Sequence, residues 1–172
     1  ALPDPDGWAP EVGFVDGFAA ARDPKAGKAW LAHCYGTVGA GRAMAPDSSN
    51  GSELYVVTGQ APRQLDLNIT TVGRVVVGME RLSVMPRGSG PLGFYTEASQ
   101  RVPILAVRLA SEIPQDQRAQ IEVMRTDTAT WDAYVESRRN RRDEWYLHPA
   151  GHIDVCTLSV PVRPIPKPAT AG

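Results

Sequence analysis

Short runs of β-branched and aliphatic residues, separated by glycine and polar clusters, dominate the chain from residue 30 onward. Apolar runs of this length, bounded by turn-forming residues, are typical of β-strands. The pattern predicts strands over six segments: residues 30–35, 54–58, 70–77, 103–109, 119–124 and 152–157. We therefore expect a fold that is mainly β.

Two segments have a different spacing of their apolar residues. Residues 78–85 and 130–142 place apolar side chains about one helical turn apart. In the second segment, Trp131, Tyr134 and Val135 follow the i, i+3, i+4 rule for one face of a helix. We therefore expect two helices among the strands.

Both ends of the chain differ from this β-rich core. Residues 1–29 are rich in Pro, Gly and Ala with scattered aromatic residues, which predicts an irregular arm. The tail after residue 157 is rich in prolines, which cannot donate to a sheet: Pro161, Pro164, Pro166 and Pro168. The expected organisation is an arm over residues 1–29, a core unit over 30–114, and a small β-α-β extension with a Pro-rich tail over 115–172.

Composition limits the class of protein and its partners. A chain of 172 residues, 42% hydrophobic and 22% charged, is long enough for one core and contains no apolar run of membrane-spanning length. The formal net charge of -1 gives no electrostatic attraction to nucleic acid or to an anionic membrane. We expect one domain plus an appendage, with neither nucleic acid nor a membrane as a partner.

The two cysteines, Cys34 and Cys156, lie far apart and lack the spacing of a metal site. Two buried thiols are the expected state, and one long-loop disulfide in an oxidising compartment is the alternative. The chain opens on Ala1 with a linker-like composition, which indicates an interior cut. Any targeting segment would then lie out of view.

Motifs for other kinds of site occur in the sequence, but the residues around them do not fit those sites. The glycines of residues 88–93 match the letters of a dinucleotide fingerprint, but they follow a helical pattern rather than a strand. His148 and His152 have i, i+4 spacing, yet a proline and a glycine between them prevent the helix that would align them. Ser52 lacks the glycines of a nucleophile elbow. We expect no metal, no cofactor and no covalent nucleophile.

Glu53 is a candidate functional residue because of where it sits. It lies in the stretch NGSELYVV, residues 50–57, where a polar turn leads directly into an apolar strand. An ionised carboxylate beside buried surface must find a partner or stay in water. Glu53 is therefore either an exposed carboxylate at a strand edge or a residue that holds a cationic group.

Several short motifs occur in order between residues 36 and 79. They are Gly36-Thr37-Val38, Arg42-Ala43, the NGSELYVV stretch, Leu65-Asp66, and TVGRVV followed by Gly78-Met79. A strand of type G-S-Q-F-F-[IV], a loop with L-D and a [VF]-G-[KR]-V-V-x-G-M segment occur in this order in one known family. On these motifs, residues 30–114 resemble the second half of a bacterial cyclophilin-type peptidyl-prolyl cis-trans isomerase.

The resemblance implies a fold, an activity and a setting. The fold is a closed antiparallel β-barrel with capping helices, here without its N-terminal part. The family's F-x-R-x-x-x-x-F-x-x-Q segment, which holds the catalytic arginine, has no match in this chain. The implied substrates are proline-containing polypeptides during protein folding, without a cofactor. A periplasmic or otherwise exported location is favoured over the cytoplasm, and the oligomeric state stays open.

The resemblance also assigns roles to individual residues. Glu53 falls where the family usually has glutamine, and we expect it to orient the missing arginine. The residues implied to bind substrate are Gly41, Arg42, Tyr55, Gln64, Leu65 and Ile69. Gln64 stands where many members have tryptophan, and Ile69 where many have histidine. These departures leave an alternative, a non-enzymatic module of chaperone type that binds proline peptides.

Overall fold

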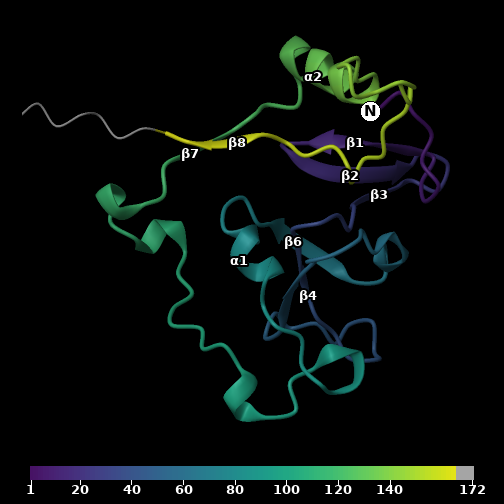
Figure 1. Cartoon of the computed structure of the whole chain (residues 1–172). Coiled ribbons are helices and arrows are strands. Elements are labelled where there is room, and N and C mark those ends of the chain that lie inside the picture. Colours follow the sequence, from purple (N-terminus) through teal and green to yellow (C-terminus); the bar gives the residue numbers. More distant parts are fainter. Residues whose placement is uncertain (166–172) are drawn as a thin grey trace, which may run out of the picture.

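The computed structural model describes residues 1–165, which form three small antiparallel sheets and two α-helices (Figure 1). The first sheet has the order β1 (Glu11–Val15), β2 (Phe18–Asp23), β3 (Lys28–Leu31). The second has the order β5 (Leu54–Val56), β4 (Thr37–Ala40), β6 (Thr70–Arg74), and the third pairs β7 (Ile121–Val123) with β8 (Val162–Pro164). The helices are α1 (Met79–Ser83) and α2 (Ala129–Arg139).

The first sheet corrects the expectation of an irregular arm over residues 1–29. Strands β1 and β2 form a tight hairpin in which Val15 pairs with Phe18. Asp16 and Gly17 connect them, both with positive φ, as a two-residue turn that follows strand twist requires. Composition misled because glycine and alanine provide much of these strands, so the hydrophobic alternation that marks a strand is weak here.

The second sheet contains the elements that the sequence predicted best. The runs at residues 54–58 and 70–77 appear as the shorter strands β5 and β6, and the helix expected at 78–85 is α1. Strand β4 lies between β5 and β6 and pairs antiparallel with both. The strand expected at 30–35 is instead the end of β3, which stops at Leu31.

Two other strand predictions are wrong. Residues 103–109 form no strand in the described chain, and Leu105 is 94% exposed. Residues 152–157 contain a turn in which the Thr157 amide donates to the Asp154 carbonyl. The last strand is β8, which includes Pro164 despite the expectation that the tail would form none. Proline is accepted because β8 pairs on one side only, with β7.

The C-terminal extension packs against the first sheet. Helix α2, the helix expected at 130–142, lies over β1 and β2 (Figure 1). Its N-cap is Thr128, whose hydroxyl accepts a hydrogen bond from the Trp131 amide. The Trp131 ring meets Phe14 of β1 edge to face, with 4.9 Å between the ring centroids. Pro166 and Pro168 lie outside the described residues.

A disulfide joins the extension to the rest of the molecule. Cys34, just after β3, is bonded to Cys156, which corrects the expectation of two buried thiols. The partner of each cysteine is 122 residues away along the chain, so no local pattern indicates the pairing. Within residues 1–165, the three sheets stay separate and do not close into one barrel. No helix in this part of the chain is both long and apolar enough to cross a membrane.

Candidate functional site

The second sheet brings several of the expected site residues to one of its ends. The Gly41 amide donates to the Glu53 carbonyl over 2.8 Å, which extends the β4–β5 pairing by one residue pair. On the other side of β4, Ala40 pairs with Thr70, so Ile69 lies close to Gly41. Glu53, Gly41 and Ile69 therefore line up across the three strands.

The Glu53 side chain lies over the Gly41 backbone. A Cβ atom added at Gly41 would lie 3.1 Å from Glu53 Oε2, so the missing side chain makes room for the carboxylate. Glu53 is exposed, and among residues 1–165 it forms no ion pair. Its carboxylate can therefore accept further hydrogen bonds.

Arg42, Gln64 and Leu65 take different places around this end of the sheet. The Arg42 guanidinium donates from Nε to the Asn68 carbonyl over 2.8 Å, and from Nη1 to the Ala43 carbonyl. It therefore holds the backbone after β4 against the backbone before β6. Gln64 and Leu65 belong to a short 3-10 turn (Arg63–Leu65), where Gln64 is exposed and Leu65 is half-buried.

Tyr55 crosses from β5 over β4 and ends on a buried histidine. It pairs with Gly39, where an added Cβ would lie 2.2 Å from the Tyr55 ring, so only glycine admits this ring position. The Tyr55 hydroxyl lies 2.7 Å from Nε2 of His33, which is fully buried. Burial raises the pKa of Tyr55, so the phenol keeps its proton and can share it in a hydrogen bond with the His33 ring.

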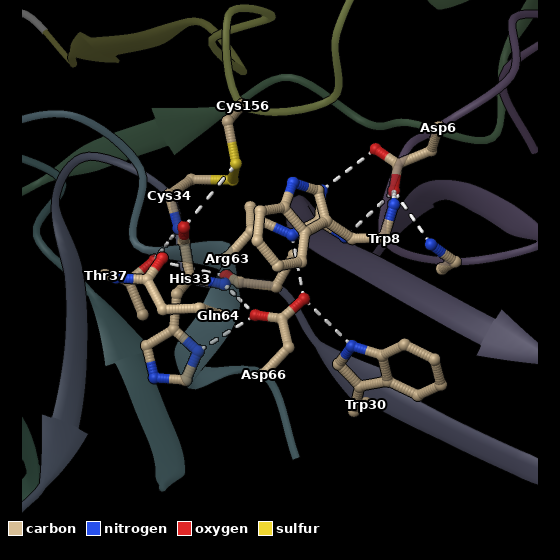
Figure 2. Close-up of polar contacts among 12 residues, drawn as sticks. Asp6, Trp8, Trp30, His33, Cys34, Thr37, Arg63, Gln64, Asp66 and Cys156 are labelled. Carbon is tan, nitrogen blue, oxygen red and sulfur yellow. Dashed lines mark hydrogen bonds and ion pairs between the residues drawn. A yellow bond between two sulfur atoms is a disulfide. The ribbon is translucent and has the colours of Figure 1, made fainter. Parts of the chain in front are cut away.

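Asp66 connects this histidine to a second set of buried charges (Figure 2). Its Oδ1 lies 3.0 Å from His33 Nδ1 and accepts from the His33 amide. Its Oδ2 accepts from Trp30 Nε1 and from Arg63 Nε. Arg63 then donates through both Nη atoms to Asp6. We call these five residues, Asp6, Trp30, His33, Arg63 and Asp66, the Asp66 network.

The sequence did not predict the Asp66 network. Its members come from three separate stretches of the chain: Asp6, the pair Trp30 and His33, and the pair Arg63 and Asp66. The Leu65-Asp66 motif is a local signal for it, but the family resemblance implies a role only for Leu65, at the substrate. The network fixes the backbone next to Leu65 and, through His33, the position of the Tyr55 hydroxyl. It therefore supports the site from behind.

Asp66 should make the stability of the protein depend on acid pH. Burial alone raises its pKa, but hydrogen bonds from His33, Arg63 and Trp30 outweigh burial and lower the pKa from 3.8 to about 2. When folding lowers the pKa of a carboxyl group, the stabilisation is complete at pH values above the pKa in the unfolded chain. It is lost as the pH falls through the pKa in the folded protein. At about 1.4 kcal/mol per pKa unit, Asp66 contributes about 2–3 kcal/mol at neutral pH.

Urea unfolding at a series of pH values from about 6 to about 2 measures this contribution. Arg139 likewise holds the pKa of Asp4 below its ordinary value, so some loss in the same window comes from Asp4. Asp66→Asn is the matched variant, and its stability should fall less steeply between pH of about 4 and about 2. An equally steep fall in Asp66→Asn would contradict the assignment to Asp66.

One comparison with known proteins identifies a family. A family model described as cyclophilin type peptidyl-prolyl cis-trans isomerase/CLD matches residues 10–108, more than half of the chain. The match includes the first sheet, most of which lies outside the predicted resemblance over residues 30–114. No curated protein matches the chain.

The chain is also similar in fold to a solved cyclophilin structure. The crystal structure of cyclophilin AquaCyp293 from Hirschia baltica superposes with a TM-score of 0.65 at 24% sequence identity. The alignment covers 89% of this chain and 54% of that one. At this identity the likeness concerns the fold, and this chain spans about half the length of that structure.

Proposed function

Because the chain belongs to the cyclophilin-type peptidyl-prolyl cis-trans isomerase family, we propose that the intact protein speeds rotation about X–Pro bonds in folding polypeptides. The barrier to this rotation is about 18–20 kcal/mol, since the twisted amide loses its resonance. Every ~1.4 kcal/mol removed from it speeds the reaction tenfold. No atom is transferred, so binding and a well-placed hydrogen-bond donor are enough.

Glu53 is proposed to orient the arginine that donates a hydrogen bond to the proline nitrogen. The observation that carries this role is the Glu53 carboxylate over Gly41, which has no ion-pair partner among residues 1–165 and lies at the end of the sheet where the expected site residues meet. An ionised carboxylate accepts a bidentate pair from a guanidinium, whose planar fork of donors is permanently charged. A part of the protein beyond residues 1–172 would supply this arginine.

Tyr55, Leu65 and Ile69 are proposed to form the apolar wall that holds the proline ring. Gly41 and Arg42 would present backbone groups to the substrate, with Gln64 at the rim. The Tyr55 ring is well suited to this role because Gly39 lies beneath it and His33 holds its hydroxyl. A wall residue fixed in one position loses little conformational freedom when a substrate binds.

The intact protein is also proposed to close these sheets into the barrel of its family. The outer strands β5 and β6 of the second sheet have one unpaired side each among residues 1–165. Open edges of this kind recruit further strands. The Cys34–Cys156 disulfide supports an exported setting, because such bonds persist mainly in oxidising compartments.

Glu53 variants of the intact protein test the proposal. In a protease-free assay with a cis-prolyl peptide, Glu53→Gln should keep nearly full activity, since an amide oxygen still accepts from arginine. Glu53→Leu cannot accept, and the misplaced arginine should lower kcat/KM by about 10²-fold. Circular dichroism checks that both variants fold. Equal activity in the wild type and both variants would refute the role of Glu53.

The same assay separates catalysis from binding alone. The 172-residue chain should show little activity compared with the intact protein. Comparable activity would mean that the chemistry does not need an arginine from elsewhere. If the intact protein binds a proline peptide but does not speed its isomerisation, the chain belongs to a binding module rather than an enzyme.

A further inference from the structure

A cavity of about 360 Å³ lies where the first sheet, the second sheet and the C-terminal segment meet. Its walls are mainly apolar and include Phe14, Phe18, Leu31, Met79, Val155 and Val160. The Cys34–Cys156 disulfide forms part of one wall. The volume falls within the range of about 300–1,000 Å³ that is usual for small-molecule sites.

One cation in this cavity has an unused hydrogen-bond donor. Arg74, the last residue of β6, lines the cavity, and its Nη2 atom is buried without a partner among residues 1–165. A buried donor without an acceptor carries the full penalty of its lost hydration. Burial accordingly lowers the pKa of Arg74.

Within residues 1–165, the cavity wall provides no negative charge to balance the Arg74 guanidinium. Nη2 lies 3.7 Å from the place of a Cβ at Gly17, near Val123 and Val160. Gly17 has a φ of 82°, so the turn favours glycine and no side chain comes between it and the guanidinium. None of the described residues that line the cavity is acidic. Arg74 is half-buried, and an anion in the cavity would balance its charge and accept from its unpaired donor.

We propose that this cavity binds a small aliphatic monocarboxylate. Its carboxylate accepts charge-assisted hydrogen bonds from the Arg74 guanidinium. Its hydrocarbon chain lies against the aromatic and aliphatic side chains of the wall. A peptide fits less well, because its amide groups would need partners along an apolar wall. None of the residues proposed to bind prolyl substrates lines this cavity, so the site is independent of the isomerase.

Calorimetric titration of the 172-residue chain tests the proposal with three probes. Octanoate should bind about tenfold or more tightly than octan-1-ol, which lacks the charge, because a hydrogen bond to an ionised group is worth about 1.5–3 kcal/mol. It should also bind far more tightly than acetate, which lacks the chain. No octanoate binding, or equal binding of either other probe, would overturn the proposal.

The variant Arg74→Met tests whether the preference for octanoate over octan-1-ol depends on this one side chain. This variant should bind octanoate and octan-1-ol equally, and its unfolding midpoint without ligand should not fall. Arg22→Met, at an exposed arginine of β2 paired with Glu11, is the matched control and should bind octanoate as the wild type does. If Arg74→Met does not fold, Arg74→Lys decides, since it keeps the charge but loses the planar fork and should weaken octanoate binding. Unchanged octanoate affinity in the folded variant would contradict the site.

Discussion

Replacing Arg63 with methionine should lower the free energy of unfolding by about 3–5 kcal/mol, the usual cost of leaving buried charges without their partner. The Arg63 side chain is 3% exposed and lies between the carboxylates of Asp6, at 2%, and Asp66, at 7%. Methionine keeps much of the length of the side chain but removes the cation that touches both carboxylates. Urea denaturation followed by tryptophan fluorescence measures the loss, since Trp30 belongs to the network.

The matched control for this experiment is Arg125→Met. Arg125 pairs with Asp127 at the surface, where both side chains are largely exposed, so its removal should leave the unfolding curve unchanged. The contrast between the two variants separates a buried pair from an exposed one. If Arg63→Met lowered the free energy of unfolding as little as Arg125→Met does, water would be compensating for the missing guanidinium. That result would contradict the burial of this ion pair.

Loss of the Cys34–Cys156 disulfide should have the second largest effect, about 2–5 kcal/mol. The bond joins positions 122 residues apart, so it removes much of the conformational freedom of the unfolded chain. Cys156 also lies just before Leu158 and Val160, which pack against α2. The bond therefore helps to hold this segment against the rest of the molecule. Comparison of urea midpoints for the oxidised protein and a Cys34→Ala, Cys156→Ala double variant measures the effect.

Reducing agent provides the internal control for the disulfide. It should lower the midpoint of the wild type toward that of the double variant and leave the double variant unchanged. The two single variants should resemble the double variant, since either one removes the bridge. A wild-type midpoint that does not respond to full reduction would show that packing alone holds the C-terminal segment in place.

The sequence predicted elements whose signal is local. Strands β5 and β6 have β-branched or aromatic residues in short runs, and α1 and α2 have apolar side chains at helical spacing. The first sheet was missed because its strands contain Gly13 and three consecutive alanines, residues that give little strand signal on their own. Asp16-Gly17 was the one local sign of a hairpin.

Features that depend on distant partners could not be predicted. Residues 103–109 have the composition of a strand, yet a strand needs a neighbour, and none lies beside them among residues 1–165. The pair of Arg63 with Asp6 spans 57 residues and joins a 3-10 turn to the N-terminal segment. Only the family motifs assigned Glu53, Gly41 and Ile69 to one site, and spacing alone could not predict their alignment because it does not set strand register.

The long connection between α1 and β7 leaves one part of the chain unusually free to change. No residue from 84 to 120 is buried, and this stretch swings away from the sheets (Figure 1). The structure before it is fixed by the second sheet, and the structure after it is fastened by Cys156. Doubling the length of a flexible loop costs only about 0.6 kcal/mol. Evolution or an engineer could therefore exchange this arc for another sequence, and so give the protein a new outer surface, while both fastened ends stay as they are.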